Sequence, residues 1–211
     1  TLKLNGSSSG YTAIDAPATA GSNTLVLPPN NGSANQILQT DGSGNLTWVD
    51  KPTSTILQVK SAELTGVYEQ TSVTGGTYYD VLTCNITPAA TSSKIFIQYH
   101  LGQVVAFGGT DKIGMQLRRG TTNIAQGDAA GSRNRYTLDA QAWDIQQASR
   151  TKNMSGFWID SPNSTSEITY RVSFLDQNGD GKFCIGRSED DSDDSTHART
   201  PSQLILMEVA G

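Results

Sequence analysis

The stretch "EITYRVSF", residues 167–174, alternates apolar and polar side chains along its whole length. Ile168, Tyr170, Val172 and Phe174 form the apolar set, and Thr169, Arg171 and Ser173 stand between them. Successive side chains of a β-strand point to opposite faces of a sheet, so the two sets are placed on opposite faces. The stretch therefore predicts a β-strand that buries one face.

Similar runs recur through residues 56–211, with Gly, Asn, Ser and Pro between them. They are "ILQVKSAEL", "TYYDVLTCNI", "KIFIQYHLGQVV", "KIGMQLRRG", "RYTLDAQAWDI", "MSGFWID", "KFCIGR" and "QLILMEVA". Residues 138–150, "LDAQAWDIQQASR", can be read as a helix or as a strand, and we interpret them as a strand. Repeated short strands of this kind predict an antiparallel β-sandwich, jelly-roll-like in form, over residues 56–211.

Residues 1–50 hold only strand fragments between turn-rich spacers. The clearest is "QILQTDGSGNLTWVD", residues 36–50, which predicts a small hairpin around the turn residues 41–45. An isolated hairpin is marginal in water, and so short a segment rarely folds alone. We therefore expect residues 1–50 to form a shaft or trimerisation segment that shares its core with other copies of the chain, with residues 51–55 as a linker.

Composition excludes two classes of partner. The chain has 211 residues and a formal net charge of −5, which leaves no basic footprint for nucleic acid. Its apolar runs, such as residues 204–207, fall far short of the roughly 20 residues that span a bilayer. We expect neither nucleic-acid binding nor membrane insertion.

The first residues, "TLKLNGSSSGYT", contain neither an initiating Met nor the apolar core of a signal peptide, so we expect a C-terminal portion of a longer polypeptide. Cys84 and Cys184 lie within predicted strands, where a buried free thiol packs as a small hydrophobic group. A disulfide between them stays open, since spacing alone does not decide pairing.

Catalysis finds little support in the motifs. His100 and His197 are the two histidines of the chain, and H-E-x-x-H and C-x-x-C motifs are absent. Ser195 stands two residues before His197, which in an extended strand would put both on one face, but no oxyanion site is evident. A carboxylate pair for sugar hydrolysis stays open. We expect no enzyme activity, no catalytic residues and no cofactor.

Two acidic stretches are candidate cation sites. "DQNGDG", residues 176–181, matches the start of a calcium loop, but its twelfth position is Arg187 where a carboxylate is needed, so a hairpin turn is favoured. The run from Glu189 to Asp194, between Arg187 and Arg199, is more typical of a solvated loop. We therefore predict no metal site, and cation binding at either stretch stays open.

Aromatic residues are candidates for sugar binding, because sugars stack on exposed rings. We expect Trp48 and Trp158 to anchor hydrophobic cores. Tyr136 and Trp143, near the polar loop "QGDAAGSRNR", are the candidate receptor-binding residues.

Two stretches carry a family resemblance. Residues 8–50, "SSGYTAIDAPATAGSNTLVLPPNNGSANQILQTDGSGNLTWVD", resemble the module before the distal domain in tail fibres and fibre-like structural proteins of marine bacteriophages, cyanophages in particular. Residues 186–211, "GRSEDDSDDSTHARTPSQLILMEVAG", are similar to the C-terminus of the same proteins.

The resemblance implies a homotrimer, in which the chain associates with two further copies of itself. It also implies a narrow β-structured shaft and a β-sandwich head. It implies an extracellular virion protein that attaches to a host surface glycan or outer-membrane component, and that joins other virion proteins through a preceding part of the polypeptide. The alternatives are a head fibre or capsid decoration protein without receptor binding and, less favoured, a polysaccharide-degrading spike enzyme.

Overall fold

The computed structural model describes residues 2–51, 55–107, 113–139, 151–188 and 190–211. Every regular element within these ranges is a β-strand, and all strand pairs are antiparallel, which confirms the predicted all-β antiparallel fold. The described residues include no helix with the length and apolar character of a membrane span. The chain divides into two compact units, Thr1–Thr53 and Ser54–Gly211, here called the N-terminal unit and the head.

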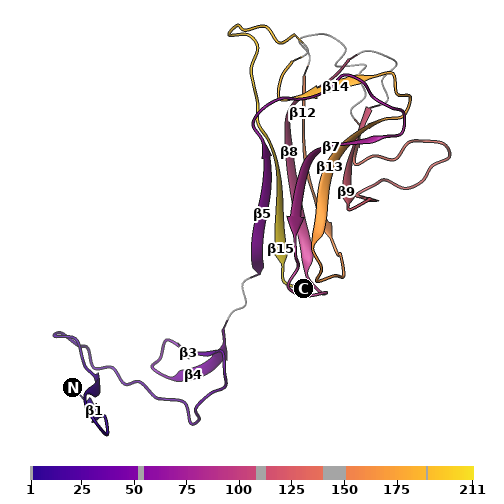
Figure 1. The fold of residues 1–211 in the computed structure, drawn as a ribbon. Coiled ribbons are helices and arrows are strands. Elements are labelled where there is room, and N and C mark those ends of the chain that lie inside the picture. The colour runs from indigo at the N-terminus through magenta and orange to yellow at the C-terminus, as the bar shows by residue number, and fades with distance from the viewer. Residues whose placement is uncertain (1, 52–54, 108–112, 140–150, 189) are drawn as a thin grey trace. The chain divides into compact units, whose positions relative to one another are not determined.

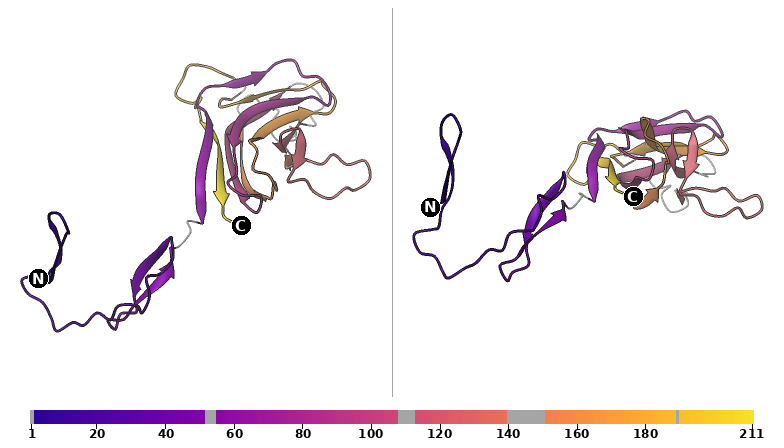
Figure 2. Two further views of the ribbon diagram at one scale, coloured as in Figure 1. Left: turned by 60° about the horizontal axis from the view of Figure 1, so that its bottom comes forward. Right: turned by 90° about the horizontal axis from the view of Figure 1, so that it is seen from below.

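The N-terminal unit consists of two separate hairpins (Figure 2). Strands β1 (Leu2–Asn5) and β2 (Tyr11–Ile14) form one, and β3 (Gln36–Thr40) and β4 (Leu46–Asp50) form the other. The turn of the second hairpin is built by Asp41, whose carboxylate accepts hydrogen bonds from the N–H groups of Ser43 and Asn45 at 2.7 and 3.1 Å. Its Gly42 and Gly44 have φ values of 79° and 98°, which glycine adopts readily.

The head contains two antiparallel sheets (Figure 1). One has the order β10-β9-β13-β7, with β11 also paired to β9, and the other has the order β5-β15-β8-β14-β6, with β12 also paired to β8. Together they enclose one core and form a nearly closed barrel. The strands are β5 (Ile56–Leu64), β6 (Tyr68–Gln70), β7 (Tyr78–Ile86), β8 (Lys94–Phe107), β9 (Ile113–Arg119), β10 (Thr122–Ile124), β11 (Leu138–Asp139), β12 (Lys152–Asp160), β13 (Ile168–Asp176), β14 (Lys182–Ile185) and β15 (Ser202–Val209).

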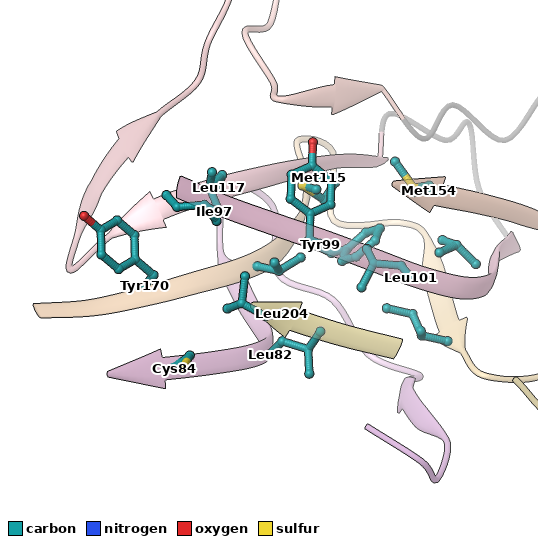
Figure 3. Close-up of a cluster of buried hydrophobic side chains, with 14 of the residues drawn as sticks. Leu82, Cys84, Ile97, Tyr99, Leu101, Met115, Leu117, Met154, Tyr170 and Leu204 are labelled. Atoms are coloured by element: carbon teal, nitrogen blue, oxygen red, sulfur yellow. The ribbon is translucent and has the colours of Figure 1, made fainter. Parts of the chain in front are cut away.

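Strand β13 confirms the alternation that predicted it. Tyr170, Val172 and Phe174 are completely buried in the core, part of which Figure 3 shows. The opposite face is only partly solvated, because Ser173 is also completely buried and its hydroxyl donates to Asp80 at 2.6 Å. A register shift between Val172 and Ser173 accompanies this contact.

The two cysteines lie in opposite sheets, Cys84 on β7 and Cys184 on β14. Both are buried, and no disulfide joins them. Burial raises the pKa of the Cys84 thiol, which keeps it in the protonated, unreactive form.

A buried carboxylate holds the last strand in place. Glu208 of β15 is completely buried and accepts hydrogen bonds from the side-chain amide of Gln58 at 2.6 Å and from the N–H of Ala89 at 2.7 Å. Burial acts to raise the pKa of Glu208, but hydrogen bonds outweigh it, and the pKa lies below its ordinary value of 4.5.

This arrangement predicts acid sensitivity. A carboxyl group with a lowered pKa in the folded state adds stability above its unfolded pKa, and this stability is lost as the pH falls through the folded value. We expect the melting temperature of Glu208→Gln to lie below that of the wild type at neutral pH, and the gap to shrink below about pH 4.5. Thermal melts of both proteins from pH 7 to pH 3 measure it; a gap that is constant over this range would contradict the role given to the charge.

Candidate functional site

The outward face of the larger sheet carries an apolar surface where solvated strands normally place polar side chains. One cross-strand row runs over four strands in register, from Ile159 on β12 through Phe96 on β8 and Met207 on β15 to Val59 on β5. Ile159 and Val59 are each 56% exposed. Figure 1 shows β5, β15 and β8 side by side, which lets these side chains form one continuous surface.

Two neighbouring rows extend this surface. On one side lie Phe157, Gln98 and Ile205, and on the other Val209 pairs with Ile56. Phe157 is 71% exposed, and its ring stacks on that of Phe96 with centroids 5.9 Å apart. We call the set the apolar band: Ile56, Val59, Phe96, Phe157, Ile159, Ile205, Met207 and Val209.

The same face becomes polar further along the strands. His100 pairs with Ser155 and Gln203, and Gln203 donates its side-chain amide to Glu63 at 2.8 Å. Open hollows of about 490 and 420 Å³ adjoin His100 on its two sides. The face thus has an apolar end and an end with amide, imidazole and carboxylate groups.

Chemically, the apolar end of this face is suited to contact with another molecule. Apolar side chains that include aromatic rings and Met, with charges confined to the margin, are typical of the centre of a protein–protein interface. His100 lies on β8 as the sequence predicts, and its neighbours on the face include Ser155, Gln203 and Glu63.

Trp158 corrects a sequence-based expectation. Its side chain is 43% exposed, so it does not anchor the core as predicted. It lies on β12, an edge strand that pairs with β8, where few neighbours cover it. Trp48 does anchor a small local cluster, since its indole lies against Gly32 and donates to the carbonyl of Asn30 at 2.9 Å.

Of the two predicted receptor-binding residues, Tyr136 is half-buried and its ring lies directly on the backbone of Gly114 in β9. Burial raises the pKa of its hydroxyl, and a hydrogen bond with Gln177 acts in the opposite direction. Trp143 lies outside the described residues, as does most of the stretch 138–150 that we interpreted as a strand; Leu138–Asp139 of that stretch forms β11. The receptor-binding role of this pair stays a prediction.

The turn at residues 176–181 is not the hairpin that the sequence suggests. It connects β13 in one sheet to β14 in the other. Asp176 is completely buried, and its two carboxylate oxygens accept hydrogen bonds from the N–H groups of Asn178 and Gly181 at 2.9 and 2.7 Å. The carboxylate therefore stabilises the crossover between sheets.

The acidic loop is cross-linked by ion pairs. His197 lies in a turn instead of a strand, and its Nδ1 is 3.0 Å from Asp194. Hydrogen bonds from Thr196 and His197 lower the pKa of Asp194 to about 2. Arg199 pairs with Asp191 at 2.6 Å, while Glu189 lies outside the described residues. Among the residues that the structure describes, no three His, Cys, Asp or Glu side chains gather as they would around a metal ion.

Comparison with known proteins gives only distant similarity. No protein-family model and no curated protein matches the chain. Among solved structures, the infectious bursal disease virus VP2 subviral particle has 10% sequence identity and a TM-score of 0.33, over 79% of this chain and 40% of that chain. The structure of infectious bursal disease virus Gx strain has 16% identity and a TM-score of 0.34, over 95% of this chain and 43% of that chain. This chain spans less than half of the length of either of these viral proteins.

Proposed function

We propose that this chain is the distal part of a homotrimeric bacteriophage fibre protein, which attaches the virion to the surface of a host bacterium. The observation that carries the proposal is the exposure of most of the apolar side chains that the structure describes in the N-terminal unit. Leu2, Leu4, Tyr11 and Ile14 are each more than 60% exposed, although they make up much of β1 and β2. Two-stranded sheets with so little cover are marginal in water.

The same exposure continues along the N-terminal unit. Its further exposed apolar side chains are Leu25, Val26, Leu27, Ile37 and Leu38. Burying this set against identical segments would remove apolar surface from water at roughly 25 cal/mol per Å². Association of identical chains therefore supplies the core that one copy lacks, which is the arrangement that the resemblance to phage fibres implies.

Attachment would be multivalent. Three heads on one shaft convert the second and third binding events into intramolecular steps, so the combined affinity exceeds that of one head by orders of magnitude. The head offers the hollow beside His100, Glu63 and Gln203, and the surface around Tyr136, as candidate contacts with a host glycan. No enzymatic step is part of this proposal.

Cell binding tests the proposal. Fluorescently labelled full chain and a chain lacking residues 1–53 are titrated onto a panel of marine cyanobacteria. We expect the full chain to bind at least one strain with an apparent affinity about 100-fold or more above that of the truncated chain. Equal affinities would contradict multivalent attachment, and no binding to any strain would favour the alternative of a structural fibre or decoration protein.

A further inference from the structure

We infer that the apolar band of the head is covered by the head of a second copy of this chain. The inference rests on the proposed trimer and adds the surface by which its heads meet. It follows from the size of the band, its lack of charge, its place on β5 and the open edge of β12.

The size of the band indicates a weak contact that depends on tethering. It crosses four strands, which lie about 4.8 Å apart, and extends over about six residues of about 3.4 Å each. Its footprint is therefore about 400 Å² on each copy, against about 800 Å² for one side of a standard stable interface. The heads alone would not stay together at low concentration.

Chain connectivity supplies the tether. Residues 51–55 alone separate β4 of the N-terminal unit from β5 of the head. Ile56 and Val59 of the band lie at the start of β5, directly after this linker. Val209, at the end of β15, pairs with Ile56. Copies that associate through their N-terminal units would hold the bases of their heads at millimolar effective concentration, at which a small apolar contact forms.

Charge favours an identical partner at this place. The chain has a formal net charge of −5, so copies repel one another over most of their surfaces. The two central rows of the face contain no charged residue. One row consists of Ile159, Phe96, Met207 and Val59, and the other consists of Phe157, Gln98, Ile205 and Ser61. The nearest charged residues on the paired rows, Lys94 and Glu63, stand at opposite margins. Two copies can therefore approach at this face without desolvating a charge.

The open edge of β12 supports the same surface. β12 pairs with β8 on one side, and none of the described strands pairs with its other side. Phe157, Trp158 and Ile159 follow one another on this edge with 71%, 43% and 56% exposure. Edge strands of monomeric proteins are usually protected by charges, Pro or bulges. β12 has a register shift between Lys152 and Met154 and charged residues at its two ends, but the stretch from Phe157 to Ile159 has none of these features, so it favours cover by another chain.

A charge placed in the band tests the inference in the full chain. Gln98 is exposed at mid-strand in the central rows, and Thr83 is exposed at mid-strand on β7 in the other sheet. The variants Gln98→Lys and Thr83→Lys thus add the same charge to two comparable surface positions. We expect Gln98→Lys to weaken the trimer roughly tenfold or more at a given urea concentration, as followed by light scattering, and Thr83→Lys to match the wild type.

The outcomes separate the two proposals. A wild-type chain that is monomeric would overturn the proposed fibre and the inference together. A trimeric wild type whose dissociation is changed equally by both lysine variants, or by neither, would overturn the inference alone. Phe157→Thr provides a second variant without added charge, and it is expected to weaken the trimer in the same direction. Circular dichroism of each variant confirms that the head remains folded.

Discussion

Replacement of Phe174 by alanine is expected to lower the free energy of unfolding of the head by about 3–5 kcal/mol, the range for truncation of a buried aromatic side chain. Phe174 is completely buried on β13, and its ring stacks on that of Phe183 on β14 with centroids 5.1 Å apart. The two strands belong to different sheets, so this contact joins the two walls of the barrel. The substitution leaves a cavity at their junction.

Urea unfolding of residues 54–211, followed by circular dichroism, measures the effect. Phe157→Ala is the matched control, because it removes an equal side chain that is 71% exposed. We expect the control to change the free energy of unfolding of this isolated head by less than about 1 kcal/mol. Equal losses in the two variants would mean that Phe174 is not in the core.

Replacement of Asp160 by alanine is the second change with a large expected effect, a loss of about 2–3 kcal/mol. Asp160 ends β12 in the larger sheet and is 8% exposed. It accepts a hydrogen bond of 2.6 Å from the hydroxyl of Tyr170 on β13 and one of 3.0 Å from Arg119 on β9, both in the other sheet. Alanine would leave the buried hydroxyl without its acceptor.

The conservative variant distinguishes this hydrogen bond from simple packing. Asp160→Asn keeps an oxygen that can accept from Tyr170 but loses the charge that pairs with Arg119. Since the side chain of Arg119 is 32% exposed, water replaces much of that ion pair, and we expect Asn to restore about half of the lost stability. Chemical denaturation of both variants measures it, and equal losses for alanine and asparagine would contradict the proposed role of the hydroxyl.

Desolvation, together with the nearby carboxylate, raises the pKa of Tyr170 far above its ordinary value of 10. In both carboxylate variants we therefore expect the hydroxyl to titrate at a lower pH than in the wild type, because one cause of the shift is gone. The ultraviolet absorbance of tyrosinate during alkaline titration reports this change.

The fold was predictable where local pattern and burial agree. The alternation in residues 167–174 predicted the buried face of β13, because three of its four apolar residues lie in the core. The turn at residues 41–45 was predictable from Asp and Gly, whose side-chain and backbone properties act locally. The path of the chain after Asp176 was not, because a turn sequence does not say whether the next strand joins the same sheet or the opposite one.

The apolar band was hidden in the sequence for a physical reason. A strand that is buried on both faces and a strand that has apolar side chains on its outward face have the same sequence pattern, a continuous apolar run. The stretch "LILMEV", residues 204–209, is an example. Leu204, Leu206 and Glu208 point into the core, while Ile205, Met207 and Val209 point outward. The register of four strands is needed to show that these outward residues join those of β5, β8 and β12. The same limit explains Trp158, since sequence does not identify an edge strand.

The central claim is that the N-terminal unit is completed by other copies of the chain. Light scattering of the full chain beside residues 54–211 tests it most directly. The account predicts a mass near three times 22.5 kDa for the full chain and a monomer for the head alone at micromolar concentration. A monomeric full chain would contradict the account, because the exposed side chains of residues 1–53 would then need no partner copy.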